Sequence, residues 1–428
     1  MAAFGLPEEL WIHVFKFLSS NDKLNIRASC RFFKRLIDHP GMWKNSTVSL
    51  KKNSAYNSHF WRTLSIRRIN SVVVVKANVK EWKQLASRLP WLISVTIDRC
   101  CDAKALETLS NFKNLKRLFI RQCRCPKLAS SISLLHQLSH LGLCQVRCAP
   151  CSDIINAVSQ LTNLTSFCYH ESSKPIPKAD LHSILRCLPN LKKLSLKMGS
   201  NQVPLPNDYL CPSQANNVSD AQYGKLSLAS LELLNYMDPI LSSEALRGVS
   251  SLKSLTVHYR CSAEDSRMCN LKTWLSTLPV LSELNISLGY HLGTYANSLP
   301  VTVRSLSLRG MLADLKAMRK TAQRVPDLLD FHLDPCCHER PSPIAELPQL
   351  FPKLQSLEMR HHNVPEKDLL GLARLSSLKR LVVLDPLMDP ESALTDLTHK
   401  LHIQTNYRVH VIHCSGPNER NSCLCAYN

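Results

Sequence analysis

The chain repeats one short pattern, LxxLxL, at nearly constant intervals over most of its length. Successive matches lie 22 to 29 residues apart, with a single longer step of 37 residues. About ten matches would arise by chance in a chain this rich in apolar residues, so the evidence is the regular spacing rather than the pattern itself. The first positions of the matches are Leu92, Leu115, Leu138, Leu164, Leu191, Leu228, Leu252, Leu281, Val303, Leu328, Leu354 and Leu378.

A stretch with helical periodicity precedes the matches. In residues 181–188, for example, Leu and Ile recur at the i, i+3, i+4, i+7 spacing of an amphipathic helix. A turn, often marked by a proline such as Pro90 or Pro189, then leads into the match. A unit with one apolar helical face and one apolar strand face cannot bury both alone, so neighbouring units must stack. The sequence therefore predicts an α/β solenoid, a curved parallel sheet with outer helices.

These repeats resemble leucine-rich repeats. Residues 114–123, NLKRLFIRQC, match the family pattern LxxLxLxxC, and the resemblance covers residues 69–412 as about 12 to 13 degenerate repeats. We expect a linker or N-terminal cap at residues 46–68 and a last strand near Tyr407-x-Val409-x-Val411. Residues 199–224, rich in Pro, Asn and Ser, are expected to form an inserted loop, and residues 413–428 a flexible, cysteine-containing tail. Three cysteines occupy the ninth slot, a buried turn position in this family, namely Cys100, Cys123 and Cys336.

The residues before the repeats do not fit the period and predict a small three-helix unit over residues 1–45. Pro7 suits the first turn of a helix, and Leu10, Val14 and Phe17 recur at helical spacing after it. Two further helices are expected before the breaker His39-Pro40-Gly41. A core of about 40 residues is marginal alone, so this unit needs outside support.

This unit is similar to an F-box, as shown by Leu6-Pro7-Glu8-Glu9-Leu10, Ser29-Cys30-Arg31-Phe32-Phe33 and the closing Asp38-x-Pro40-x-x-Trp43. In that family the unit binds the Skp-type adaptor of cullin–RING ubiquitin ligases. The resemblance implies that the adaptor contacts are Leu6, Pro7, Ile12, Phe15, Leu18 and Leu24. An alternative is that these residues only pack the three helices together and against the first repeats.

Positive charge is concentrated in the first third of the chain. The formal net charge is +20, and residues 1–130 hold 24 Lys and Arg against 8 Asp and Glu, or +16 of that total. Such a surface could bind nucleic acid, but no RRM, zinc-finger or helix-turn-helix signature accompanies it, so nucleic-acid binding is not expected. An acidic protein partner, or a simply solvated face, explains the charge better.

Strand alternation predicts which repeat residues point away from the core. The leucine slots point inward, so the residues between them face the concave side of the sheet. Early repeats place mostly basic residues there and later repeats place mixed or acidic ones, although many of these are expected to be plain solvated surface. The candidate substrate-binding residues are Arg117, Phe119, Arg121, Lys193, Lys197, Glu283, Asp330, Asp334, Glu358 and Arg360.

The segment Cys144-x3-Cys148-x2-Cys151 has the spacing of an iron–sulfur loop, which keeps a metal enzyme open as an alternative. A repeat solenoid lacks the barrel that usually carries such loops, so no metal or cofactor is expected. No nucleophile–base spacing, P-loop or paired-carboxylate motif is found, and we expect no catalytic site. The segment Cys425-Ala-Tyr-Asn has the spacing of a prenylation signal but not the residues such a signal prefers.

We expect the chain to work in the cytoplasm and/or nucleus. Glu8 and Glu9 stand where an export signal would carry basic residues, and the longest aliphatic run is Val72–Val75, far short of the roughly 20 apolar residues of a membrane span. Without export, its 18 cysteines are expected to stay reduced.

Taken with the resemblances, these features predict the substrate-recognition subunit of an SCF-type ubiquitin ligase. The F-box would tether the chain to the adaptor, and the repeats would hold a protein substrate. The chain itself would not be an enzyme, because ubiquitin transfer belongs to a conjugating enzyme recruited by the RING subunit. The main alternative is a leucine-rich-repeat scaffold that binds a protein without ubiquitin transfer.

Overall fold

A computed structural model gives the fold of the chain. It describes residues 5–44, 46–51, 55–99, 103–125, 127–146, 151–170, 174–199, 203–211, 227–263, 265–335, 343–360, 364–384 and 394–414. The chain forms two compact units, Met1–Leu164 and Thr165–Asn428, which are described one at a time below as unit 1 and unit 2.

Unit 1 begins with three short helices and a turn of 3-10 helix: α1 (Glu8–Lys16), α2 (Ser20–Ser29), α3 (Arg31–Ile37) and η2 (Pro40–Met42). The Ser19 hydroxyl accepts a hydrogen bond from the Asp22 N–H at 3.1 Å and caps α2. The Cys30 thiol does the same for α3, accepting from the Phe33 N–H at 3.4 Å. These caps fix the two turns between the helices, and the predicted three-helix unit is confirmed.

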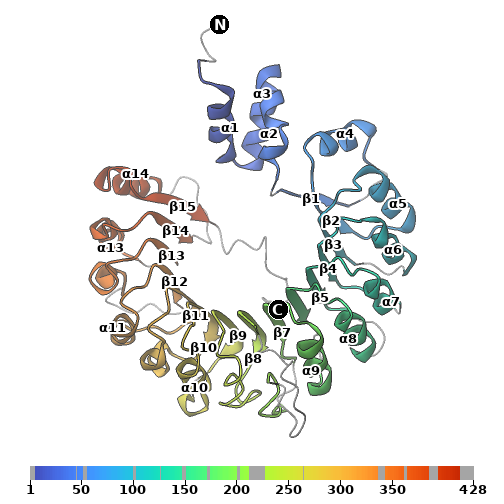
Figure 1. Ribbon diagram of the computed structural model, residues 1–428. Helices are drawn as coiled ribbons and strands as arrows, with labels where there is room; N and C mark the ends of the chain where they lie inside the picture. Colours follow the sequence, from blue (N-terminus) through green and yellow to red (C-terminus); the bar gives the residue numbers. More distant parts are fainter. Residues whose placement is uncertain are drawn as a thin grey trace. The chain divides into compact units, whose positions relative to one another are not determined.

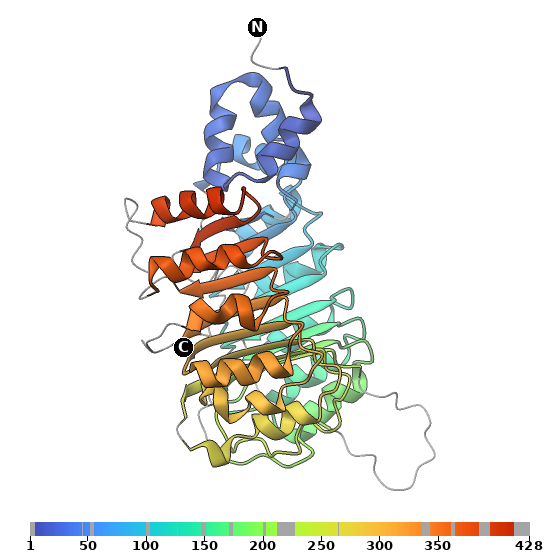
Figure 2. The ribbon, with the colours of Figure 1, turned by 90° about the vertical axis from the view of Figure 1, so that its left-hand side faces the viewer.

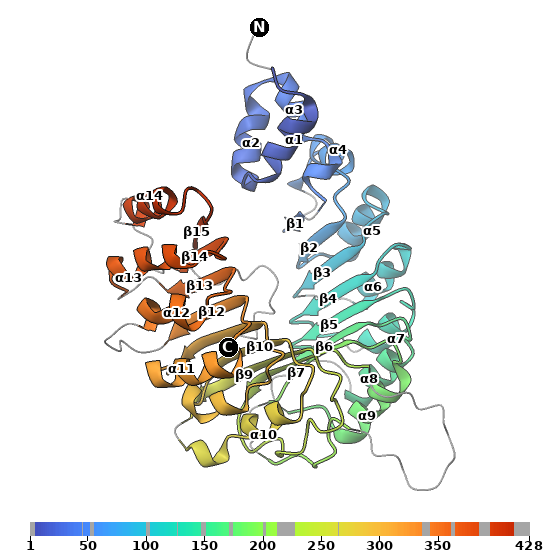
Figure 3. The same cartoon turned by 60° about the vertical axis from the view of Figure 1, so that its left-hand side comes forward.

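Five parallel strands follow in unit 1, each paired with the next: β1 (Thr47–Leu50), β2 (Ser71–Val75), β3 (Ser94–Asp98), β4 (Arg117–Arg121) and β5 (His140–Cys144). The connecting helices all lie on one side of this sheet (Figures 1 and 3). They are α4 (Ser58–Ile66), α5 (Val79–Arg88), α6 (Ala103–Glu107), η4 (Thr108–Asn111), α7 (Leu128–Ser133) and α8 (Cys151–Ser159).

Unit 2 continues the same design with β6 (Ser166–His170), β7 (Lys193–Lys197), β8 (Ser230–Tyr236), β9 (Ser254–Ser262), β10 (Glu283–Gly289), β11 (Ser305–Met311), β12 (Asp330–Pro335), β13 (Ser356–Arg360), β14 (Arg380–Leu384) and β15 (His410–Cys414). Neighbouring strands are parallel, and Figure 2 shows the later ones side by side with helices along one face. The helices are α9 (Lys178–Cys187), η5 (Ser266–Met268), α10 (Leu271–Ser276), η6 (Leu292–Thr294), η7 (Ala296–Ser298), α11 (Leu315–Arg324), η8 (Pro343–Glu346), α12 (Leu347–Leu350), α13 (Glu366–Gly371), η9 (Leu372–Arg374) and α14 (Leu394–Gln404).

The leucine pattern builds the core between sheet and helices. In the repeat around β4, Leu115, Leu118 and Ile120 are all completely buried, and Cys123 is buried in the turn slot as predicted. Burial of each such apolar side chain stabilises the fold by about 1.5–3 kcal/mol. A single repeat could not bury these side chains without its neighbours. Cys100 and Cys336 lie outside the described residues. The predicted fold class is confirmed: a helical N-terminal unit followed by parallel strands with helices, of the leucine-rich-repeat type.

Two boundaries differ from the prediction, and part of the inserted loop is buried. Residues 46–68, expected as a linker or cap, contribute β1 and α4, so the repeats start one strand earlier. The last strand begins at His410, and Tyr407 precedes it with a left-handed φ of 56°. In the inserted loop, Tyr209 is buried and its hydroxyl donates to the Ile176 carbonyl at 2.7 Å, while residues 212–224 lie outside the described residues.

Candidate functional site

Helix α1 carries an exposed apolar stripe. Leu10, Val14 and Phe17 recur along one side of the helix and its C-terminal cap, and they are 49%, 46% and 79% exposed. Leu6 before the helix and Leu24 on α2 are also large, apolar and nearly half exposed. Unit 1 therefore leaves several large apolar side chains of its helical part uncovered, which is typical of a protein-binding surface. These five residues are called the apolar face below.

The predicted adaptor contacts divide into three groups. Leu6, Pro7 and Leu24 are exposed, and Ile12 and Leu18 are half-buried. Phe15 differs from the prediction: only 2% of it is exposed, and its ring packs 5.3 Å from Phe33. It belongs to the core of the helical unit and has no surface to offer a partner. The sequence had marked Leu10, Val14 and Phe17 only as evidence for a helix, yet they form its exposed stripe.

An ion-pair cluster joins this helical part to the first repeats. Asp38, the cap of α3, lies 2.8 Å from Arg27 on α2 and 2.8 Å from Arg67 at the end of α4. Arg67 also lies over the Trp43 ring, 4.0 Å from its centroid. Burial alone would raise the pKa of Asp38, but hydrogen bonds and charges from the two arginines outweigh it and lower that pKa below its usual value. The cluster fastens the apolar face to the solenoid within unit 1.

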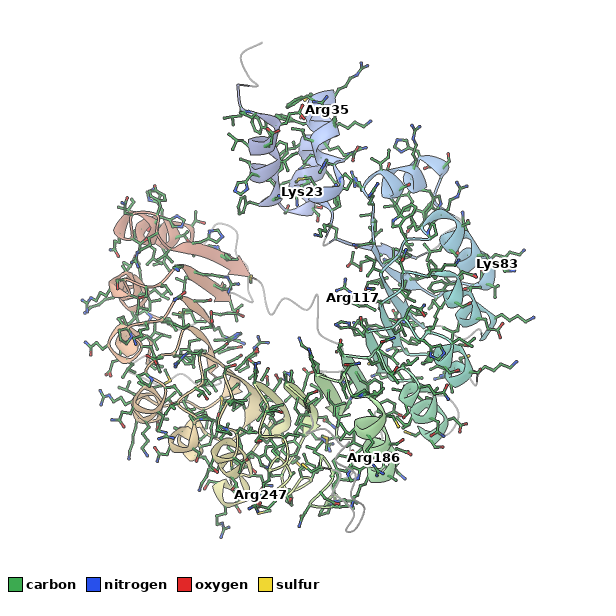
Figure 4. All side chains as sticks on the ribbon, in the orientation of Figure 1. Lys23, Arg35, Lys83, Arg117, Arg186 and Arg247 are labelled. Carbon is green, nitrogen blue, oxygen red and sulfur yellow. The ribbon has the colours of Figure 1, made fainter. Side chains whose placement is uncertain are left out.

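On the uncovered face of the unit 1 sheet, β4 presents Arg117, Phe119 and Arg121, while Leu118 and Ile120 point into the core. Figure 4 shows Arg117 on the side of the sheet away from the helices, whereas Lys83 on α5 points the other way. The Phe119 ring covers Gly142 on β5, where a Cβ atom would lie 2.2 Å from the ring. Among the described residues, Arg117 and Arg121 have no ion pair within 4.0 Å, and the Arg121 Nε is buried without a hydrogen bond.

The corresponding face of unit 2 carries a chain of polar contacts across four strands. His170 Nε2 lies 2.7 Å from the Ser195 hydroxyl, which donates to Glu232 at 2.5 Å. Glu232 lies 3.7 Å from His258 Nε2 on the next strand. Burial alone would raise the pKa of Glu232, but His258, Ser195 and the charge of His170 outweigh it and lower that pKa.

This row of polar contacts contains a serine, two histidines and a carboxylate, but in a different order from a catalytic triad. In a triad the histidine accepts the serine proton and the acid orients the histidine. Here the Ser195 hydroxyl donates its hydrogen bond to Glu232 rather than to a histidine. The hydroxyl is thereby held as a hydrogen-bond donor, which suits a structural bridge between strands.

Further along unit 2, acidic side chains are paired with basic neighbours. Glu358 Oε1 lies 3.0 Å from His332 Nδ1, and this hydrogen bond is the main cause of the lowered Glu358 pKa. Arg360 contacts Asp334 through two hydrogen bonds of 2.5 and 3.0 Å. Much of the negative charge that the sequence places on this face is therefore matched within the face itself.

The remaining predicted residues vary in accessibility. Lys193, Glu283 and Asp330 are exposed at the start of their strands, as expected for residues that a partner could reach. Lys197 differs from the prediction: it is only 7% exposed, so its ammonium group is not displayed to a partner. Asp330 and Glu358 lie on the same face of the sheet, because in the strand register Asp330 pairs with Ser356 and Glu358 with His332 across β12 and β13.

The described residues contain no group of three or more His, Cys, Asp or Glu side chains that could hold a metal ion. Of the three cysteines with iron–sulfur spacing, Cys144 is buried, Cys151 is half-buried and Cys148 lies outside the described residues. In the described part of the chain, no helix combines the length and the apolar character needed to cross a bilayer.

Comparisons with known proteins address the helical part directly. Residues 4–49 match the F-box-like family model. No curated protein sequence matches the chain. Among solved structures, the chain is similar to one in the Toll–Spätzle complex from Drosophila, with 13% identity and a TM-score of 0.43 over 85% of this chain and 50% of that one. It is also similar to one in the TLR13–ssRNA13 complex, with 16% identity and a TM-score of 0.33 over 78% of this chain and 57% of that one. The chain thus spans about half of the length of the chains in these structures.

Sequence reasoning missed several residues that complete these surfaces. Arg67 completes the Asp38 cluster, where it lies over the Trp43 ring, and His258 and His332 complete the polar contacts of unit 2. A usable signal existed for the histidines: both occupy strand positions that alternate with buried residues, Val257 and Leu333. No such signal existed for Arg67, whose contact with Asp38 joins residues 29 positions apart.

Proposed function

We propose that this chain is the substrate-recognition subunit of an SCF-type ubiquitin ligase. The observation that carries the proposal is the apolar face, which lies within the residues that match the F-box-like family model. A unit this small that leaves Phe17 79% exposed needs a covering partner, and a Skp-type adaptor is the partner that the family match suggests. The repeats would then hold a protein substrate.

The mechanism we propose is proximity. The adaptor links the chain to the cullin–RING scaffold, and the repeats hold the substrate near the recruited conjugating enzyme. Attack of a substrate lysine on the ubiquitin thioester becomes effectively intramolecular, which raises the local concentration of the reactants. In this proposal the chain supplies no reacting group, no cofactor and no metal. It would act in the cytoplasm and/or nucleus, where such ligases work.

Proximity works best when the connection is rigid. The Asp38 cluster supports this, because it connects α2, α3 and the end of α4 within unit 1 through contacts of 2.8 Å. An adaptor bound to the apolar face would therefore be held at a fixed position relative to the first repeats. Flexible attachment would spread the substrate over a larger volume and lower its effective concentration.

The first experiment measures co-purification of the full chain with a Skp-type adaptor. Leu10→Asp with Val14→Asp places two charges in the exposed stripe, so adaptor binding should be lost while the repeats stay folded. Leu6→Ala with Pro7→Ala tests the exposed residues before α1 and should also weaken adaptor binding. The matched control is Lys16→Asp, an exposed residue of α1 outside the stripe, which should retain the adaptor. Undiminished binding by the Leu10 and Val14 double variant would contradict the proposal.

A second experiment separates a ligase receptor from a scaffold. Proteins that bind the repeats are compared in cells that hold the intact chain and in cells that hold the Leu10 and Val14 double variant. A ligase substrate should accumulate and lose its ubiquitin conjugates with the variant. A partner whose abundance and ubiquitination do not change would favour the scaffold alternative.

A further inference from the structure

The β4 surface of unit 1 combines two cations and one ring along a single strand. Arg117, Phe119 and Arg121 alternate on the uncovered side of the sheet. With a rise of about 3.3 Å per residue, the two arginines start about 13 Å apart and Phe119 lies midway between them. Arg117 is exposed, and the other two are half-buried.

The Phe119 ring lies over Gly142 and beside small or apolar residues of the neighbouring strands. Strand register places Val73, Thr96, Phe119 and Gly142 in one row across β2 to β5. The absence of a side chain at Gly142 leaves the space that the Phe119 ring fills. This row offers a shallow apolar surface with the arginines of β4 on either side of it.

The charge around this row is mainly positive. Exposed Lys76 and Arg99 follow β2 and β3 at the same edge of the sheet as Arg121. Asp98 is the one carboxylate on the described strands of this face; it stands opposite Arg121 in the strand register, but its ion pair within 4.0 Å is with Arg99, at 3.9 Å. Among the described residues, Arg117 and Arg121 therefore keep their charges available for a ligand.

We propose that the β4 surface binds an extended acidic segment of a protein, with acidic side chains at positions i and i+4 and an apolar side chain at i+2. An extended peptide has the same rise and the same two-residue alternation as β4, so its acidic groups can reach Arg117 and Arg121 while the apolar group contacts Phe119. This inference rests on the proposed function, because it names the chemistry of the substrate that the repeats would hold.

The surface fits a peptide better than single-stranded nucleic acid. Nucleic-acid platforms stack successive bases on several aromatic side chains. Phe119 is the one Phe, Tyr or Trp on the uncovered side of the described unit 1 strands, so this face offers one ring rather than a series on which successive bases could stack.

The test is fluorescence anisotropy with the full chain and two labelled peptides of equal composition. The first peptide contains Glu-Ser-Leu-Ser-Glu, and the second contains Leu-Ser-Glu-Glu-Ser, in which the acidic groups are adjacent. The first should bind about tenfold more tightly than the second, and its binding should weaken with added salt. Arg117→Glu with Arg121→Glu should weaken it by about tenfold or more.

Two further variants separate charge from shape. Gly142→Ala adds a Cβ where the Phe119 ring lies and should weaken binding of the first peptide without changing any charge. Lys83→Glu with Arg88→Glu makes the same charge change on exposed positions of α5 and should leave peptide binding unchanged. Equal binding of the two peptides, equal loss in the α5 control, or tighter binding of a labelled oligothymidine of matched length would each overturn the inference.

Adaptor co-purification on the same preparations keeps the two proposals distinguishable. The Arg117 and Arg121 double variant should retain the adaptor, because both residues lie outside the matched residues 4–49. Adaptor binding without selective peptide binding would overturn the β4 inference alone. Selective peptide binding without adaptor binding would overturn the proposed function and leave the β4 surface as the binding site of a scaffold.

Discussion

The uncovered sheet faces of the two units use charged residues in different ways. In unit 1, Arg117 and Arg121 have no ion pair within the described residues. In unit 2, Glu232, Glu358 and Asp334 are each held by a neighbour on an adjacent strand. The difference shows that a count of charges along the repeats does not give the charge that a partner would meet. Charges paired across strands stabilise the sheet, and unpaired charges remain available for binding.

The largest effect is expected where unit 1 does pair its charges, at Asp38. Asp38→Ala leaves Arg27 and Arg67 partly buried without their shared carboxylate and should lower the free energy of unfolding by about 3 kcal/mol. Urea unfolding measures the loss, and hydrogen exchange should show it in α3 and α4. The control is Arg35→Ala, which breaks an exposed pair with Glu8 and should cost about 0.5 kcal/mol or less. Equal losses would show that the cluster does not fasten the helices.

A somewhat smaller effect is expected at Glu232, in the middle of the polar chain of unit 2. Glu232→Ala removes the acceptor of the Ser195 hydroxyl and the carboxylate beside His258. We expect a loss of about 2 kcal/mol in the free energy of unfolding, with faster hydrogen exchange in β7 to β9. Asp330→Ala, at an exposed position of β12, should change stability by less than about 0.5 kcal/mol. If the two variants lose the same stability, the polar chain does not hold the strands.

The stabilisation that unit 2 gains from the contact between Glu358 and His332 depends on pH. The pKa of Glu358 is lowered below 4.5, chiefly by the hydrogen bond with His332 and also by the charges of His332, Arg309 and Arg380. Its stabilising contribution is therefore present above the unfolded value and is lost as the pH falls through the lower folded value. Glu358→Gln should cost about 1 kcal/mol at pH 7 and progressively less as the pH falls through the lowered pKa of Glu358.

Thermal unfolding of the two proteins between pH 7 and pH 3 measures this dependence. The unsubstituted chain should lose more stability over that range than the Glu358→Gln variant, because the variant has no carboxylate to protonate at that position. Glu283→Gln, an exposed position of β10, provides the control and should follow the unsubstituted chain. Parallel pH profiles for Glu358→Gln and the unsubstituted chain would show that the His332 contact adds no stability.

The sequence predicted the repeat architecture well because burial imposes it locally. The leucine slots of each repeat lie in the core, and the observed strands from β3 to β14 coincide with the predicted matches. Strand β1 was missed because Asn45 stands three residues before Val48, where the pattern requires an apolar residue.

The candidate surfaces were less predictable, for two physical reasons. Helix α1 has apolar residues on more than one side, and helical spacing alone does not decide that Phe15 packs inward while Phe17 stays exposed. Charge pairing depends on neighbours one repeat away, as with Asp334 and Arg360, which are 26 residues apart. Side-chain reach across strands decides such pairs, and the repeat period gives only the register.

The smallest effect on stability is expected at the β4 surface, and it decides how the contrast between the units is understood. Arg117→Gln with Arg121→Gln removes two charges that have no ion-pair partner among the described residues, so the free energy of unfolding should change by less than about 0.5 kcal/mol. Asp334→Ala breaks a two-bond contact with Arg360 and should cost about 1 kcal/mol by the same urea measurement. A loss at Arg117 and Arg121 as large as that at Glu232 would mean that these arginines hold the sheet together. If this variant keeps its free energy of unfolding but loses peptide binding, the two arginines serve binding of a partner rather than stability of the sheet.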